Sequence, residues 1–310
     1  MISVIIPNWN GKKFLKTCLD SLRKQTYQDI EIILVDNGSK DGSVLFTKEN
    51  FPEVRILQFE ENFGFSAAVN KGIRASKGEY ISLLNNDTEV DPHWLQELKK
   101  GLDENPKVGF CASKIFFYDQ RKRINSVGLR MGVDDSAWDI GFDALDKEQY
   151  DEKQFIFGAC AAAAIYRRSL FQDVGFFDED FFIYVEDVDL SFRAQLRGYK
   201  CLYVPSAIVY HRWSATAQQN KNISGFYIER NLLFNLMKNM PLYFLIRFPL
   251  KIVRFNLSRF WNFLVLGRLP IWWKSRFSVL PYSRKMLQKR WYIQSRRRVS
   301  LQYVISILDK

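Results

Sequence analysis

The chain has 310 residues, of which 47% are hydrophobic and 25% are charged, with 45 Lys and Arg against 34 Asp and Glu. This composition predicts a globular protein of about two domains and excludes low-complexity and coiled-coil classes. The four cysteines stand alone, without CxxC spacing, so neither a disulfide scaffold nor a zinc module is expected and a reducing compartment fits best. No secretory signal is expected, because the N-terminal apolar run ends at Pro7 and no basic region precedes it.

Positive charge is concentrated in the last part of the chain. Residues 221–310 hold 18 Lys and Arg and two acids, whereas residues 1–220 hold 27 Lys and Arg and 32 acids. We therefore expect a slightly acidic domain over residues 1–220 and a basic, aromatic-rich region over residues 221–310. Such a region binds either nucleic acid or an anionic membrane surface.

The first half of the chain alternates short apolar runs with amphipathic helical patterns. Strands are predicted at residues 2–6, 31–35, 54–59, 80–84 and 108–112, and helices at 12–24, 66–76 and from Pro92 to about Leu102. This alternation predicts an α/β fold whose parallel sheet is covered by helices. The polar region 119–153 has mixed periodicity and is expected to be irregular or to form excursion strands.

Regular patterns return after residue 154. An apolar run of small residues covers 155–166, a helix is predicted at 185–197 and closed by Gly198, and strands follow at 201–204 and 208–210. Beyond residue 224 the pattern is almost wholly helical.

The helical region carries a narrow polar stripe on an apolar and aromatic surface. The stripe consists of Arg247, Lys251, Arg254, Ser258 and Asn262. Charges interrupt every apolar stretch before the roughly 18–20 residues that a membrane-spanning helix needs. We therefore expect this region to lie in the membrane interface rather than to cross the membrane.

Polar clusters follow four of the predicted strands, at residues 7–10, 36–39, 61–64 and 85–87. Any one of them alone is typical of a turn rich in Asn, Asp and Gly. Ligands of an open parallel sheet gather beyond the carboxyl ends of its strands. Four such clusters together therefore predict a binding site at that edge.

The sequence contains neither GxGxxG nor GxxxxGK[ST], so a phosphate group would need another partner. A divalent metal held by a carboxylate can neutralise phosphate. Asp87, flanked by amides at a strand end, is the candidate ligand for Mg²⁺ or Mn²⁺, and His211 is a candidate second ligand. A lone His is otherwise a hydrogen-bonded structural residue, which is the interpretation that we favour for His93.

The densest acidic run spans residues 178–189, and its second part opens a predicted helix. Acids in a first helical turn are favoured by the helix dipole and can act as caps, and the i,i+4 pair of Asp189 and Arg193 is typical of a structural contact. Alternatively, Glu186 or Asp187 is a general base, since a helix start beside the apolar residues 181–184 fixes a carboxylate near a pocket.

An ordered series of segments resembles the family 2 glycosyltransferases with a GT-A fold, especially their bacterial rhamnosyltransferase-like members. The series is SVIIPNWNG, EIILVDNGSKDGS, ENFGFSAAVNKGI, YISLLNNDTEV, FGACAAAAIYRR, VGFFDEDFFIYVEDVDLSFR, IVYHRWS and YIERN, and it covers about residues 1–235. The resemblance implies an α/β fold, namely a GT-A type nucleotide-sugar-binding domain with a mostly parallel central sheet. A helical, basic C-terminal region follows that domain.

The resemblance also implies roles for single residues. Asp36 would contact the uracil or thymine base, Asn86 the ribose, and Asp87 the metal, with His211 completing the metal site. Asp187, or Glu186 as the second choice, would deprotonate the acceptor hydroxyl. The residues expected to bind the nucleotide sugar are Pro7, Asn8, Trp9, Asn10, Asp36, Asn62, Asn70, Asn85 and Asn86. Many relatives have DxD where this chain has Asn-Asn-Asp, and the single remaining carboxylate predicts modest metal affinity.

The predicted function is an inverting glycosyltransferase that moves rhamnose or a related hexose from a dTDP- or UDP-sugar to a glycan. The expected acceptor is a polyprenyl-diphosphate-linked glycan of cell-surface polysaccharide assembly, and the expected location is the cytoplasmic face of the membrane, bound to its anionic surface. One alternative is a nucleic-acid-binding protein, against which the apolar surroundings of the C-terminal aromatics argue. These aromatics are Phe244, Phe248, Phe255, Phe260, Trp261 and Phe263. In a second alternative the basic region is only a packed subdomain or a dimer contact.

Overall fold

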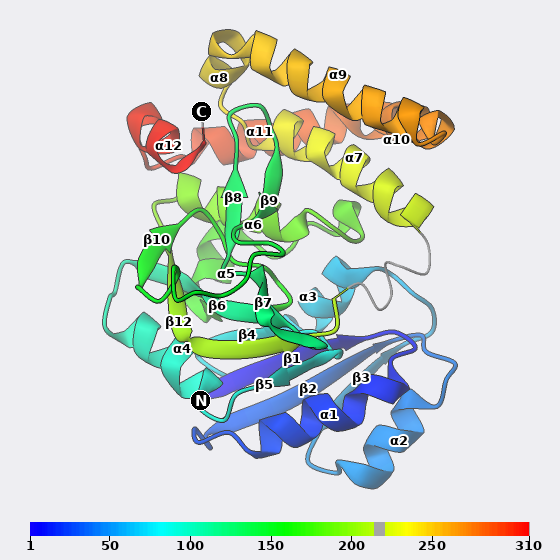
Figure 1. The fold of residues 1–310 in the computed structure, drawn as a ribbon, viewed down its shortest axis with the longest axis vertical. Coiled ribbons are helices and arrows are strands. Elements are labelled where there is room, and N and C mark those ends of the chain that lie inside the picture. Colours follow the sequence, from blue (N-terminus) through cyan, green and yellow to red (C-terminus); the bar gives the residue numbers. More distant parts are fainter. Residues whose placement is uncertain (214–220, 310) are drawn as a thin grey trace.

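A computed structural model gives the fold of residues 1–213 and 221–309 (Figure 1). The elements of the first part are β1 (Ile2–Asn8), α1 (Lys12–Arg23), β2 (Ile30–Asn37), α2 (Ser43–Asn50), β3 (Arg55–Phe59), α3 (Phe65–Ala75), β4 (Tyr80–Leu84), β5 (Thr88–Val90), α4 (Trp94–Asp103) and β6 (Val108–Phe117). They are followed by β7 (Gln120–Ser126), β8 (Leu129–Met131), β9 (Ala137–Asp139), β10 (Gln154–Ile156), β11 (Ala163–Arg167), α5 (Arg168–Val174), the 3₁₀ turn η1 (Glu179–Phe181), α6 (Glu186–Leu196) and β12 (Lys200–His211).

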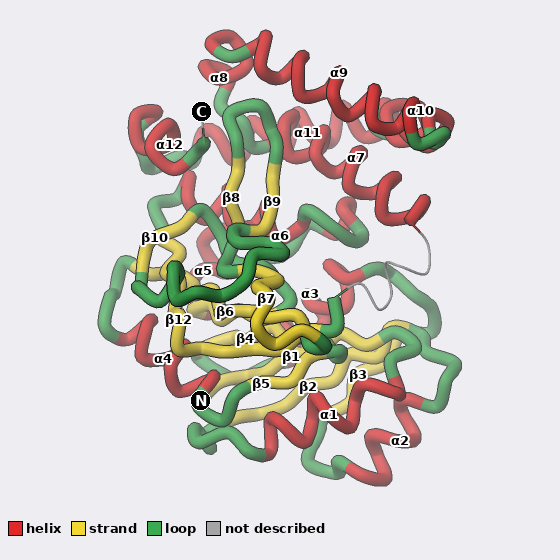
Figure 2. The backbone as a smooth tube through the Cα atoms, in the orientation of Figure 1, coloured by secondary structure: helices red, strands yellow, loops and turns green. Residues whose placement is uncertain are grey.

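Ten of the described strands form one sheet. Figure 2 draws all strands in yellow, both those of this sheet and the separate pair β8 and β9. Its order is β10-β12-β6-β11-β4-β1-β2-β3, with β5 paired to β12 and β7 paired to β6. Strands β4, β1, β2 and β3 are parallel, as are β12 and β6, whereas β11 is antiparallel to both of its neighbours. The predicted α/β fold with a mostly parallel central sheet is confirmed, and the loops that leave β1 to β4 emerge at one edge.

Helices cover both faces of the sheet because side chains alternate along each strand. Ile2, Val4 and Ile6 of β1 are buried in a core shared with α1 and α4. Ile5 points to the other face, into a core shared with α3, α5 and α6. The sheet is thus a rigid support for the loops at its edge.

Residues 119–153, predicted to be irregular or to form excursion strands, contain β7, β8 and β9. Strand β7 folds back on β6, and β8 and β9 form a separate hairpin in which Leu129 lies opposite Asp139. Leu129 and Met131 are buried in a core with Phe192 of α6. The hairpin therefore packs directly on the helix that starts with Glu186.

The C-terminal helices form a layer at one end of the long axis (Figure 1). They are α7 (Lys221–Lys238), α8 (Leu242–Arg247), α9 (Pro249–Val265), α10 (Leu269–Phe277), the 3₁₀ turn η3 (Leu280–Tyr282), α11 (Ser283–Ser295) and α12 (Leu301–Ile307). The predicted helical character is confirmed. Phe244 and Val304 share a buried core with α6, and Phe234 packs on Phe181, so the layer is joined to the sheet domain through side chains.

The predicted boundary between residues 220 and 221 adjoins residues 214–220, which lie outside the described residues. None of the helices in the part of the chain that the structure describes is both long enough and apolar enough to cross a membrane.

Several predicted bounds need correction. Strand β6 continues to Phe117, and the two predicted strands at 201–204 and 208–210 are one strand, β12, with a register shift between Val204 and Ile208. The apolar run 155–166 is divided between β10, a loop and β11. The short elements α2 and β5 were not predicted.

Candidate active site

The loops after β1, β2 and β4 meet through the side chain of Asn8. Its Nδ2 donates to Oδ1 of Asp36 at 2.9 Å and to Oγ of Ser39 at 3.2 Å, while its Oδ1 accepts from Nδ2 of Asn86 at 2.6 Å. The second oxygen of Asp36 accepts from the backbone N–H of Ser39 at 3.0 Å. Asn8 and Asp36 are almost completely buried, so the network fixes the Asp36 carboxylate at the edge of the sheet.

The loop after β3 joins the same edge. Nδ2 of Asn37 donates to Oδ1 of Asn62 at 2.9 Å and to the carbonyl of Gly64 at 3.0 Å, and Oδ1 of Asn37 accepts from the N–H of Phe63. The four predicted polar clusters therefore do lie together, although Asn62 serves to shape the loop.

The remaining predicted residues of the β1 loop differ in exposure. Pro7 is within the strand, opposite Val35, whereas 43% of Trp9 is exposed. Asn10 has a left-handed backbone with φ of 51°, and its N–H donates to Oγ of Ser39 at 2.8 Å. The turn therefore leaves the indole of Trp9 at the surface beside the Asp36 network.

Asn70 is not brought to this edge. It is buried on α3, where Nδ2 donates to the carbonyl of Phe177 at 2.8 Å and to Oε1 of Glu179 at 2.9 Å, and Oδ1 accepts from the N–H of Phe177 at 3.0 Å. These contacts attach α3 to the segment before α6. Asn70 was expected to contact the nucleotide sugar. In the structure its amide instead forms hydrogen bonds with Phe177 and Glu179.

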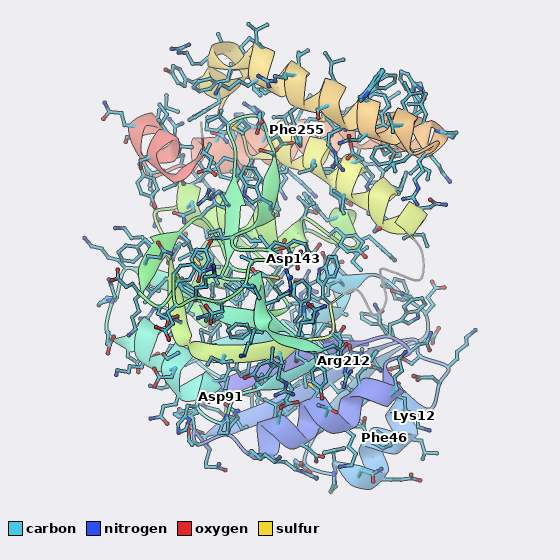
Figure 3. The ribbon with its side chains drawn as sticks, in the orientation of Figure 1. Lys12, Phe46, Asp91, Asp143, Arg212 and Phe255 are labelled. Carbon is cyan, nitrogen blue, oxygen red and sulfur yellow. The ribbon has the colours of Figure 1, made fainter. Side chains whose placement is uncertain are left out.

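Asp87 and His211 meet because β5 pairs with the end of β12, with Thr88 opposite His211. Nε2 of His211 lies 3.2 Å from Oδ1 of Asp87 and 3.5 Å from Nδ2 of Asn85, and Nδ1 lies 3.0 Å from Oδ1 of Asn125. Figure 3 marks this part of the site by Arg212, the next residue along the chain.

The donor set at this place fits a divalent cation. Oδ1 of Asn125 can only accept, so Nδ1 of His211 carries the hydrogen of that bond, and Nε2 is the ring nitrogen that faces the Asp87 carboxylate. Burial alone would raise the pKa of Asp87, but the charge of His211 and its hydrogen bond outweigh burial and lower it. The carboxylate is thus kept ionised, as a metal ligand must be.

Residues 1–213 and 221–309 contain no group of three or more His, Cys, Asp or Glu side chains suited to a metal ion. Mg²⁺ is commonly bound through one or two carboxylates and takes its other oxygens from phosphate and water, so the Asp87 carboxylate can serve as such a ligand. Asn125, which orients His211, was not found from the sequence because it comes from β7, 86 residues before the histidine.

Asp187 lies next to the strand edge because of the loop before β11. Its Oδ2 accepts from the N–H of Ala161 at 3.2 Å, and its Oδ1 accepts from the N–H of Val188 at 2.8 Å. The carbonyl of the adjacent Ala162 accepts from the N–H of Asn85 at 2.8 Å. Residues 161 and 162 thus connect the candidate base to the segment that carries Asp87.

Glu186 is the more deeply buried of the two acids. Its Oε2 has no hydrogen-bond partner among the described residues. Burial, followed by the charges of Asp187 and Asp189, raises the pKa of Glu186, and burial also raises that of Asp187 against the effect of its two backbone N–H donors. A carboxyl whose pKa is raised toward neutrality is suited to accept a proton.

A third carboxyl, that of Asp139 on β9, faces the same place and was missed by the sequence analysis. Burial raises its pKa to about 6, with a further contribution from the charge of Asp187, against the effects of Ser126 and His211. Its Oδ1 is a buried acceptor without a partner in the described part of the chain. The excursion hairpin thus contributes to the site, which neither periodicity nor motif spacing indicated.

Comparison with known proteins identifies a matching protein family. The family model described as "Glycosyl transferase family 2" matches residues 3–175. "N-acetylglucosaminyl-diphospho-decaprenol L-rhamnosyltransferase" of Mycobacterium tuberculosis is 28% identical over 237 residues, which cover 68% of this chain and 76% of that protein. "Uncharacterized protein y4gI" of Sinorhizobium fredii is 29% identical over 228 residues, covering 70% of this chain. The chain spans only 25% of the Sinorhizobium protein, and less than half of several other relatives.

Among solved structures, the mannosyltransferase PcManGT from Pyrobaculum calidifontis, in complex with GDP-Man and Mn²⁺, is similar with a TM-score of 0.58. It is 16% identical, and the similarity covers 99% of this chain and 82% of that one. At this identity the similarity concerns the fold alone, and it agrees with the predicted GT-A architecture.

Proposed function

Because the chain belongs to glycosyl transferase family 2, we propose that it is an inverting glycosyltransferase. It moves a sugar, rhamnose or a related hexose, from a dTDP- or UDP-sugar to a glycan hydroxyl. The observation that carries this proposal is the connection of the Asp36–Asn8–Asn86 network, through Asn85 and residues 161–162, to the carboxylate of Asp187. This connection supports the proposal that a nucleotide site and a proton acceptor lie side by side.

The donor nucleotide is assigned to the edge of the sheet. Each oxygen of Asp36 accepts one hydrogen bond from the protein, which leaves lone pairs for the imide N–H of uracil or thymine. The exposed indole of Trp9 can stack on that base. The carbonyl oxygen of Asn86 is available to a ribose hydroxyl, since the known bond of this side chain uses Nδ2.

Asp87 and His211 are the residues that would hold Mg²⁺ or Mn²⁺. Such a cation, when bound, neutralises the charge that the diphosphate leaving group develops. The chain's own part is to keep Asp87 ionised and to hold the His211 ring through Asn125, which keeps Nε2 beside the Asp87 carboxylate.

Asp187 supplies the proton acceptor. Its carboxylate removes the hydroxyl proton of the acceptor while that oxygen attacks the anomeric carbon from the face opposite the diphosphate. The bond from the anomeric carbon to the diphosphate oxygen breaks, and the configuration at that carbon inverts. The N–H groups of Ala161 and Val188 fix the orientation of the carboxylate.

The outer face of α8 and α9 supports attachment to an anionic membrane surface. An apolar stripe recurs there at helical spacing, each member at least 41% exposed, formed by Ile246, Leu250, Val253, Leu257, Trp261 and Leu264. Arg247, Lys251 and Arg254 are exposed beside it. Apolar side chains next to cations fit the interface of anionic lipids.

A groove of about 570 Å³ continues this apolar surface between α8 and α11. Leu242, Tyr243, Leu287 and Trp291 line it together with basic side chains such as Arg290. The Mycobacterium relative is named for an acceptor that carries a decaprenol chain. We assign to this chain a polyprenyl-diphosphate-linked acceptor of cell-surface polysaccharide assembly, reached from the inner face of the membrane.

Donor binding tests the proposed function. The melting temperature is measured with dTDP-, UDP- and GDP-sugars, each in Mn²⁺ and in EDTA, for the wild type and Asp87→Ala. We expect one dTDP- or UDP-sugar to raise it, by an amount equivalent to about 2.7 kcal/mol at 100 times Kd, and EDTA to reduce the effect in the wild type only. The control is Glu49→Ala, an exposed acid of α2 outside the network. Absence of any nucleotide-sugar effect would contradict the proposed function, and equal binding in EDTA would contradict the metal site.

A further inference from the structure

The segment that leads into α6 has an unusual backbone. Phe182, Tyr184 and Val185 have φ angles of 63°, 69° and 67°, in the left-handed region that non-glycine residues rarely adopt. Val185 is also β-branched, which makes this conformation still less favourable. It directly precedes Glu186 and Asp187, so the strained segment sets the direction in which these acids leave the backbone.

Asn231 of α7 binds this segment from the C-terminal layer. Its Nδ2 lies 2.9 Å from the carbonyl oxygens of Phe181 and Ile183 and 2.7 Å from that of Tyr184. Asn231 is completely buried. The two hydrogens of one side-chain amide are therefore shared among three backbone acceptors in and directly before the strained segment.

Arg230, the preceding residue, extends the contact. Its Nη2 donates to the carbonyls of Asp180 at 2.8 Å and Phe181 at 2.9 Å, and its Nε donates to Oδ1 of Asn231 at 3.0 Å. The guanidinium thus also fixes the orientation of the Asn231 amide. Through these hydrogen bonds the buried side chains of Arg230 and Asn231, at the centre of α7, have polar partners.

The start of α6 is attached to the same layer by charge. Nζ of Lys238 lies 2.5 Å from Oδ2 of Asp178 and 2.6 Å from Oδ1 of Asp189, and Nδ2 of Asn239 donates to Asp189 at 2.7 Å. Asp178 and Asp189 lie before and after the strained segment. Its two ends are therefore fixed independently of Asn231, which acts on the carbonyls between them.

We infer that Asn231, oriented by Arg230, is a positioning residue for the transfer reaction: it holds the strained segment 182–185 so that Asp187 faces Ala161 and the sheet edge. This inference rests on the proposed function, in which Asp187 is the base. Asn231 itself contacts only this protein and is not a catalytic residue. Backbone strain is commonly retained at functional sites where the surrounding structure enforces it.

The test compares Asn231→Asp, which keeps the shape but loses the two N–H donors, with the same substitution at Asn256 of α9, whose amide donates only within its own helix. We measure kcat, the KM of the acceptor, the Kd of the donor and the melting temperature. Misplacement of the base is expected to lower kcat about 10- to 100-fold. The donor Kd should stay within about two-fold, because the strand-edge network does not include α7.

Two further substitutions, Val185→Gly and Arg230→Lys, extend the test, and Arg230→Lys keeps the inference testable if Asn231→Asp folds poorly. Glycine adopts the left-handed region without strain. The Asn231→Asp substitution should therefore lower kcat by a smaller factor in a Val185→Gly background than in the wild type. Arg230→Lys, which loses the forked donors but keeps the charge, should lower kcat to a smaller extent.

The outcomes distinguish a failure of the proposed function from a failure of the positioning role of Asn231. An inactive wild type with every donor would overturn the proposed function. An active wild type whose Asn231→Asp and Arg230→Lys variants keep normal kcat would overturn the positioning role alone. A kcat loss accompanied by an equal loss of donor affinity, without recovery by Val185→Gly, would show a general structural role and also overturn it.

Discussion

Three carboxyl groups with raised pKa values, those of Asp187, Glu186 and Asp139, are the candidates for acid–base chemistry at the proposed site. They come from the first turn of α6 and from the excursion hairpin. Burial raises the pKa of each, and the negative charge of Asp187 adds to the effect on the other two. Of the three, Asp187 is oriented by two backbone N–H donors, which favours it as the base.

Asp139 gives a prediction for the pH dependence of stability. Its pKa is about 6 in the folded protein, against an ordinary value of 3.8, so folding favours the protonated form. The resulting stabilisation is present below pH 3.8 and is lost as the pH rises through 6. Between pH 4 and pH 7 the wild type should lose roughly 2–3 kcal/mol of unfolding free energy relative to Asp139→Asn, measured by urea denaturation.

The control for this comparison is Asp143→Asn, an exposed acid of the same region that is labelled in Figure 3. It should follow the wild-type pH profile. Parallel profiles for the wild type and Asp139→Asn would show that Asp139 is not held in a raised-pKa environment.

Sequence patterns located the residues that follow predicted strands and helices, but not those that support them. Asp36, Asp87 and His211 were found because strand ends point to a shared edge. Asn125 and Asp139 lie in a region without clear periodicity, and only the fold brings them to His211 and Asp187. Asn70 was placed at the nucleotide site by motif position alone, and packing of α3 against Phe177 uses its amide instead.

At the scale of elements, α8 and α9 combine two surfaces with different roles. Phe244 and Phe263 point inward and are buried, while the stripe that contains Leu250 and Trp261 points outward. The polar stripe predicted from the spacing of Arg247, Lys251 and Arg254 is exposed beside it. Helix packing explains the inner face, and we propose the anionic membrane surface as the partner of the outer face.

Charge reversal on α9 tests whether the outer face binds an anionic membrane surface. Lys251→Glu/Arg254→Glu should bind anionic vesicles at least roughly ten-fold more weakly than the wild type, since each Lys or Arg contributes about 1 kcal/mol near such a surface. Vesicle co-sedimentation at two salt concentrations measures the loss. The melting temperature and donor Kd should remain unchanged, because neither side chain contacts the strand-edge network.

The matched control is Lys24→Glu/Lys48→Glu, which changes the net charge equally at exposed positions on and next to α1 and α2. It should retain vesicle binding. Undiminished binding by the α9 variant would exclude this stripe as the membrane contact. A lowered melting temperature or a dissociated oligomer would favour the alternative of a packed subdomain or dimer contact.

Elements with a clear period were predicted closely, and short ones were not. Strand β4 was predicted with the bounds that it has. Helix α2 has three consecutive apolar residues, 44–46, and therefore shows no helical periodicity. Strand β5 has three residues, too few for any pattern, yet its pairing with β12 brings Asp87 to His211.

At the scale of the whole molecule, the acidic and basic parts of the sequence occupy different regions of the structure. Figure 3 shows Arg212 near the strand edge and Phe255 of α9 well separated from it along the long axis. The buried pairs of Lys238 with Asp178 and Asp189 join the helical layer to α6 and to the segment before it. The division by charge was visible in the sequence, but the contacts across it required the fold.

The transfer reaction itself tests the central claim most directly. The wild type and Asp187→Asn are incubated with the donor that binds and with polyprenyl-diphosphate-linked glycan in anionic vesicles, and proton NMR follows the anomeric signal. We predict that the wild type releases nucleoside diphosphate and forms a product of inverted anomeric configuration, about 10²–10⁴-fold faster than Asp187→Asn. An intact donor, a product of retained configuration, or equal rates for the two proteins would contradict the account.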